Sequence, residues 1–163
     1  SIYMQMIKGF ENLSEQELNT LTEVPVLITF LIAGSDNNID EQERDWAERL
    51  IEFRSMKNDG ELVEYYNLVE RRWDDHFHAY AEKMNDYSEP KQRCEYLSEE
   101  LEKCNEILPK VDNSVAGKLY NSFLTFSRQI ALSSGGILGF GAISPEENQW
   151  VGLKMIQSPA VNQ

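Results

Sequence analysis

The sequence has few of the residues that form disulfides, bind metals or cross membranes. Its 163 residues include two cysteines, two histidines and no run of 18 apolar residues. Cys94 and Cys104 fall in one expected helix, where their spacing of about 15 Å along the axis prevents a disulfide between them. Two unpaired thiols and the lack of a secretory hydrophobic region favour a cytoplasmic location. Insertion into a membrane is not expected.

Basic residues are also scarce, and the formal net charge is −13. Residues 1–109 hold 25 of the 28 acidic and 11 of the 15 basic residues, which leaves residues 110–163 nearly neutral. Nucleic acid is an unsuitable partner because binding to phosphates requires a basic patch. Anionic membrane surfaces are disfavoured for the same reason. The acidic part instead suits a cation or a protein partner with a basic surface, unless the charge serves solubility alone.

The most apolar stretch, residues 24–33, predicts the buried centre of the fold. Between residues 26 and 32 only Thr29 is polar, and a helix that is apolar on all sides is normally surrounded by other helices. Pro25 suits a first helical turn, where its missing N–H costs nothing. We therefore expect the buried helix to begin at Pro25, after a separate short helix over residues 14–23.

An acidic turn follows the buried helix and leads into another helix. Asp40 is its expected N-cap, and Glu43 stands three residues later, which is the capping-box spacing. The same two carboxylates, together with Asp36, offer oxygen ligands of the kind that Ca²⁺, Mg²⁺ and Mn²⁺ prefer.

The turn does not match an EF-hand loop. Counted from Asp36, Glu41 takes the place of the glycine at the sixth position and Ala47 that of the glutamate at the twelfth. Two interpretations stay open. Asp36, Asp40 and Glu43 form a cation site, or the turn is a capped and solvated corner.

Capping signals and apolar spacings of three to four residues indicate the remaining helices. The expected helices cover residues 14–23, 25–33, 40–53, 61–87, 90–108, 113–130 and 144–156. Together they predict an all-α, single-domain bundle of about seven helices over residues 13–157, with a lead-in at residues 1–12 and a tail at residues 158–163.

The two histidines lie in the expected helix over residues 61–87. His76 and His78 are two residues apart, so they project about 200° away from each other and do not chelate one metal ion. Asp74 and Glu82 each stand four residues from His78, and ion pairing on a solvated face is the commoner outcome of that spacing.

A glycine-rich segment covers residues 133–142. It has neither a preceding strand nor the Lys-Ser/Thr ending of a nucleotide-binding loop. Its apolar residues Ile137, Leu138 and Phe140 either fold down onto the core or form a tip that binds a partner.

The start of the acidic helix is echoed near the carboxyl end. Residues 39–46 and 143–150 share an isoleucine, a capping residue, a glutamate and a tryptophan at identical spacing. This echo predicts two helix–turn–helix halves related by a pseudo-twofold axis.

Residues 33–43, which read Ala-Gly-Ser-Asp-Asn-Asn-Ile-Asp-Glu-Gln-Glu, resemble the signature of the TerB-like, tellurite-resistance-associated family. The resemblance implies an all-helical domain with acidic clusters suspected of metal binding, found in stress-response and membrane-associated assemblies. The acidic positions of the family then fall on Asp36, Asp40 and Glu43, with Glu147 as their counterpart in the second half.

Three functions follow from these patterns. The first is a non-enzymatic TerB-like domain whose acidic turn binds a divalent cation or a basic protein partner. The second is an interaction module that docks through residues 133–142 and the near-neutral carboxyl part, with no metal role. The third, an enzyme, has least support, since the sequence contains no identifiable Ser–His–Asp or Cys–His combination. The oligomeric state is not determined by these patterns.

Overall fold

The computed structural model describes residues 7–35, 38–56, 60–135 and 145–159. Regular secondary structure within these residues is entirely helical, which confirms the all-α class. In chain order the elements are α2 (Glu15–Ala33), α3 (Glu41–Met56), α4 (Val63–Met84), α5 (Pro90–Glu102), α6 (Cys104–Ile107), the 3-10 helix η1 (Leu108–Lys110), α7 (Asn113–Gly135) and α8 (Pro145–Trp150).

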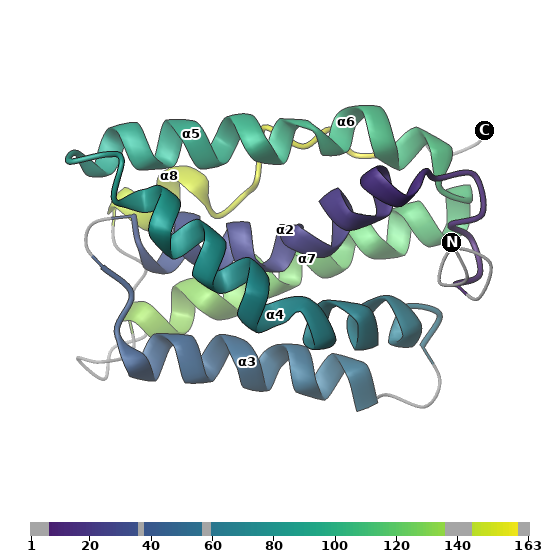
Figure 1. The fold of residues 1–163 in the computed structure, drawn as a ribbon, viewed down its shortest axis with the longest axis horizontal. Coiled ribbons are helices and arrows are strands. Elements are labelled where there is room, and N and C mark those ends of the chain that lie inside the picture. Colours follow the sequence, from purple (N-terminus) through teal and green to yellow (C-terminus); the bar gives the residue numbers. More distant parts are fainter. Residues whose placement is uncertain (1–6, 36–37, 57–59, 136–144, 160–163) are drawn as a thin grey trace.

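Helix α2 is the centre of the bundle and packs against α3, α4, α5, α6, α7 and α8. In Figure 1, α2 and α7 run through the middle of the molecule, with α5 and α6 along one edge and α3 along the opposite edge. Every residue of α2 from Val24 to Ala33 is buried. The central position follows from the sequence, because a helix apolar on all sides needs other helices around it.

The apolar stretch does not form a helix of its own. The prediction of a short helix followed by a new start at Pro25 is wrong, because α2 continues through that proline. Pro25 has no N–H, so the carbonyl of Leu21, four residues earlier, receives no hydrogen bond from it. The hydroxyl of Tyr65 on α4 donates to this carbonyl at 2.6 Å. A tyrosine distant in the sequence therefore replaces the missing bond.

The described part of the lead-in packs against the start of α7. Ile7 and Phe10 are buried in the core, and the N–H of Asp112 donates to the carbonyl of Gly9 at 2.9 Å. Gly9 has a φ of +94°, and a Cβ added there would lie 2.8 Å from the Cγ2 of Val115. Glycine is required at this position both by its backbone conformation and by the close approach of α7.

The last helix is shorter than predicted. Helix α8 ends at Trp150, whereas the sequence pattern predicted a helix to about residue 156. Leu153 has a φ of +47°, which a right-handed helix does not allow, and the resulting turn buries both Leu153 and Ile156 in the core. The capping residues correctly predicted where this helix starts, but Leu153 and Ile156 are buried by a turn rather than by a helix.

Candidate functional site

Large apolar side chains remain exposed along α3 and near the end of α7. Trp46, Phe53 and Met56 lie about two turns and then about one turn apart, so they follow one stripe of α3, and Leu132 lies on α7. These side chains are 39%, 63%, 67% and 49% exposed, respectively. We call these four residues the α3–α7 face. Exposed apolar residues gathered on one face are typical of a protein-binding surface.

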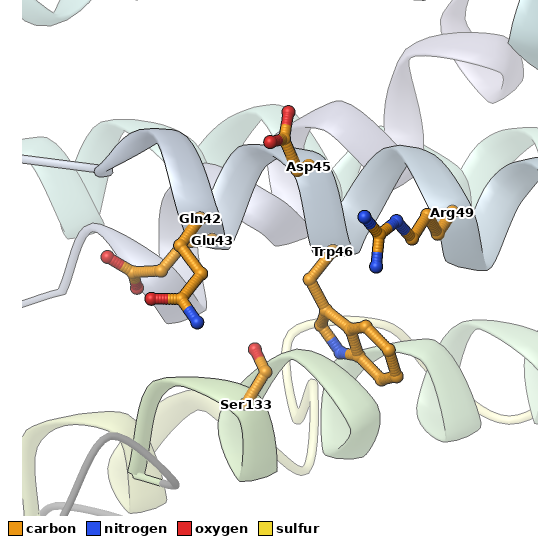
Figure 2. A pocket seen from close by; sticks show the side chains of 6 residues that line it. All are labelled: Gln42, Glu43, Asp45, Trp46, Arg49 and Ser133. Carbon is orange, nitrogen blue, oxygen red and sulfur yellow. The ribbon is translucent and has the colours of Figure 1, made fainter.

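The α3–α7 face is hollowed next to Trp46. A hollow of about 390 Å³ is lined by Gln42, Glu43, Asp45, Trp46 and Arg49 of α3 and by Ser133 of α7. Figure 2 shows the indole of Trp46 between the two helices, facing the helix that carries Ser133. An apolar ring in the gap and carboxylates at the start of α3 suit a partner with both apolar and basic side chains.

Gln129 of α7 forms hydrogen bonds to two residues of α3 on this face. Its backbone carbonyl accepts a hydrogen bond from the indole Nε1 of Trp46 at 3.2 Å. Its side-chain Oε1 accepts one from the Nη2 of Arg54 at 2.7 Å. The separation of α3 and α7 is thus fixed at two points, which lowers the entropy cost of binding a partner there.

The acidic turn leads directly into the same region. The Oδ1 of Asp40 accepts a hydrogen bond from the N–H of Glu43 at 2.7 Å, and the Oε1 of Glu43 accepts one from the N–H of Asp40 at 3.2 Å. This confirms the predicted capping box. Asp36, the third predicted cation ligand, lies outside the described residues. The cation site therefore stays a prediction, with Asp40 and Glu43 already bonded as helix caps.

Asp40→Ala is expected to lower the free energy of unfolding by about 1 kcal/mol, because α3 loses its N-cap. Asp40→Asn keeps the capping oxygen and is expected to leave the stability nearly unchanged. Urea denaturation measures both effects. An equal stability of Asp40→Ala and wild type would contradict the capping role.

The same Asp40→Asn variant tests the cation prediction. If the turn binds Ca²⁺, Mg²⁺ or Mn²⁺, millimolar amounts raise the thermal midpoint of metal-stripped wild type by mass action, and the variant responds less. Identical midpoints with and without each ion would remove the cation site from consideration.

The other predicted binding residues, Ile137, Leu138 and Phe140, lie outside the described residues. The glycine-rich segment nevertheless starts within the described part, at Ser133, and this residue lines the hollow beside Trp46. The acidic turn and the glycine-rich segment are far apart in the sequence. Glu43 from the first and Ser133 from the second nevertheless line the same hollow.

The two histidines face different surroundings, as their spacing predicted. His78 is exposed, whereas His76 is half-buried, and its Nδ1 has no hydrogen-bond partner within the described structure. Burial lowers the pKa of His76, and the nearby Glu23 only partly opposes this effect. Among the described residues, no group of three or more His, Cys, Asp or Glu side chains is placed to hold a metal ion.

His76→Gln is expected to reduce the loss of stability between about pH 7 and pH 5. A histidine in the unfolded chain has a pKa of about 6.5, and that of folded His76 is lower. As the pH falls through 6.5, the unfolded state takes up a proton that the folded state does not, so the wild type is destabilised. Urea unfolding of wild type, His76→Gln and the control His78→Gln at each pH measures the difference. Parallel profiles for wild type and His76→Gln would contradict this expectation.

Neither cysteine is placed as a nucleophile. Cys94 and Cys104 are both buried and form no disulfide, as their position on an apolar stripe predicted. Burial raises the pKa of the Cys104 thiol to about 12, so the reactive thiolate is scarce at neutral pH.

No helix in the described part of the chain is long and apolar enough to span a bilayer.

Comparison with protein-family models, with curated proteins and with solved structures gives no match. The described residues form an all-helical domain in which the α3–α7 face is hollowed and partly apolar. The sequence analysis did not predict Phe53, Met56 or Leu132 as binding residues. For Phe53 and Met56, the weak local signal was their position off the buried stripe of α3, which contains Ala47, Leu50 and Ile51.

Proposed function

We propose that this chain is a non-enzymatic interaction module that binds a basic, amphipathic segment of a partner protein along the α3–α7 face. The observation that carries the proposal is the position of Trp46, Phe53, Met56 and Leu132, which are exposed on two helices held together by Gln129. An amphipathic helix commonly binds by inserting apolar side chains into such a groove between helices.

Charge favours a basic partner. Glu43 and Asp45 outnumber the one cation, Arg49, among the residues that line the hollow beside Trp46, and the chain as a whole carries a net charge of −13. A field of one sign accelerates the encounter with a partner of opposite sign, and complementary charges at the rim then determine how the partner docks. The apolar side chains supply most of the affinity in such an interface.

This proposal combines two alternatives that the sequence left separate. A basic partner was predicted for the acidic turn, and a docking surface for the glycine-rich segment with the near-neutral carboxyl part. Glu43 at the start of α3 and Ser133 near the end of α7 border the same hollow, so one partner segment contacts both regions.

Membership of the TerB-like family and a role in stress response stay predictions that rest on the motif at residues 33–43. The pseudo-twofold relation also stays a prediction. Helix α3 spans 16 residues and α8 spans six, so the proposed halves differ in the helix that follows each turn.

A pair of designed peptides tests the proposed function. Both are amphipathic helices of about 18 residues with the same leucine positions, one with lysine and one with glutamate on the polar face. Fluorescence anisotropy is expected to show saturable binding of the lysine peptide and at least about tenfold weaker binding of the glutamate peptide, a difference of about 1.4 kcal/mol. Equal affinity for both peptides, or no binding of either, would overturn the proposal.

A matched pair of charge variants locates the binding. Glu43→Gln with Asp45→Asn removes two charges at the hollow, and Glu95→Gln with Glu99→Gln removes two from α5, on the opposite edge of the molecule (Figure 1). The first pair is expected to weaken lysine-peptide binding about fivefold and to reduce its dependence on salt, whereas the second changes it little. An equal effect of both pairs would show that total charge, not this face, attracts the peptide.

A further inference from the structure

A second hollow lies farther along α3, where the end of that helix meets the start of α4 and the middle of α7. Its volume is about 500 Å³, within the range of about 300–1,000 Å³ that small-molecule sites occupy. Phe53 and Arg54 of α3 form one wall, Tyr66 of α4 the second, and Ser122 and Thr125 of α7 the third.

Arg54 provides a positively charged guanidinium in this hollow. Its guanidinium donates to the carbonyl of Leu50 at 3.1 Å and to the Oε1 of Gln129 at 2.7 Å. It also lies over the rings of Tyr66 and Phe126, 5.8 Å and 5.5 Å from their centroids. Within the described chain, Arg54 forms no ion pair with a carboxylate, although acidic residues outnumber basic ones 28 to 15.

The geometry leaves part of this guanidinium available. Arginine has five N–H hydrogens. Hydrogen bonds to Leu50 and Gln129 use two of them, and a hydrogen bond to the Tyr66 side chain uses a third. The rings and Gln129 hold the group in place, so an incoming anion does not have to order it. A carboxylate is the best match, because its two oxygens accept paired hydrogen bonds from a guanidinium.

The remaining walls favour an apolar ring attached to that carboxylate. Phe53 is exposed at the rim, and the ring of Tyr66 is buried at the floor, where its hydroxyl is hydrogen-bonded to the hydroxyl of Ser122. The other cation of the hollow, Lys118, is already paired with Glu61 at 3.0 Å. Arg54 has no ion pair among the described residues and lies next to the exposed ring of Phe53, which favours a single negative charge on a flat, apolar ligand.

We propose that the hollow around Arg54 binds a small organic carboxylate that carries an aromatic ring, with the carboxylate on Arg54 and the ring against the exposed Phe53. This site goes beyond the proposed partner binding, since it takes a small molecule and depends on the positive charge of Arg54, which the peptide proposal uses only as a link from α3 to Gln129 on α7.

Phenylacetate and indole-3-acetate, each compared with its neutral amide, test this site. Saturation-transfer NMR and titration calorimetry on the wild-type chain are expected to show millimolar or tighter binding of at least one acid, with the matching amide at least about tenfold weaker, because the amide lacks the charge that pairs with Arg54. Equal affinity of acid and amide, or no binding of either acid at millimolar concentration, would overturn the proposal.

Two variants test whether the acid binds in the hollow around Arg54. Arg54→Gln removes the guanidinium, and Thr125→Trp fills the hollow from an exposed position on α7 while leaving Arg54 intact. Both are expected to weaken binding of the acid at least about tenfold, whereas Arg93→Gln on α5 removes the same charge elsewhere and leaves it unchanged. Unchanged binding of the acid to Thr125→Trp would show that the ligand binds outside this hollow. This result can be obtained even if Arg54→Gln does not fold. Binding of the lysine peptide is measured separately, so the two proposals can fail independently.

Discussion

Tyr65→Phe is expected to lower the free energy of unfolding by about 2 kcal/mol, although it removes a single oxygen atom. The hydroxyl of Tyr65 is the donor to the carbonyl of Leu21, which Pro25 leaves without its helical partner. Tyr65 is fully buried, so water cannot replace the lost bond in the variant. Leaving a buried carbonyl unpaired costs its desolvation free energy, about 1–3 kcal/mol.

A double-mutant cycle separates this account from a general loss of packing. Pro25→Ala restores an N–H that can donate to the carbonyl of Leu21, so the cost of Tyr65→Phe in that background is expected to fall below about 1 kcal/mol. Urea denaturation of the four proteins measures the coupling. The same cost of Tyr65→Phe in both backgrounds would show that the hydroxyl does not compensate for the proline.

Phe53→Gln combined with Leu132→Gln is expected to weaken binding of the lysine peptide by at least about 30-fold, which corresponds to about 2 kcal/mol. The side chains of Phe53 and Leu132 are 63% and 49% exposed, and they come from the two helices, α3 and α7, that form the α3–α7 face. Burying such side chains against a partner contributes most of the affinity of a typical interface, and the polar replacements remove that contribution without changing the net charge.

The fold is expected to tolerate these replacements. Glutamine is a good helix former, and neither side chain is buried in the core, so the free energy of unfolding should change by less than about 0.5 kcal/mol. Tyr87→Gln is a control that removes an aromatic ring stacked on Tyr96, near α5 and away from the groove. Peptide affinity in the double variant equal to that of wild type would exclude Phe53 and Leu132 as anchors.

Local signals in the sequence predicted the features that depend on neighbouring residues. The capping box of Ser14 and Glu17 forms at the start of α2, and that of Asp40 and Glu43 at the start of α3. The apolar spacing of α4 also predicted its buried face, which includes Trp73. Caps and amphipathic stripes are determined within a few turns of helix, so one sequence is sufficient to find them.

The features that sequence patterns missed depend on residues far apart in the chain. A proline at position 25 normally indicates a helix start, and the helix continues through it because Tyr65 supplies a hydrogen bond from another helix. The hollow around Arg54 likewise depends on the position of α7, which contributes Ser122, Thr125 and Gln129 to its walls. Such facts follow from packing, which the sequence does not display directly.

Amide NMR of the ¹⁵N-labelled wild-type chain, titrated with the lysine peptide, tests the partner-binding proposal most directly. The proposal predicts that the largest shift changes occur at the indole N–H of Trp46 and at the backbone amides of Arg49, Phe53 and Leu132, with little change along α5. Shift changes centred on α5, or spread evenly over the acidic surface, would contradict the assignment of the α3–α7 face as the binding site.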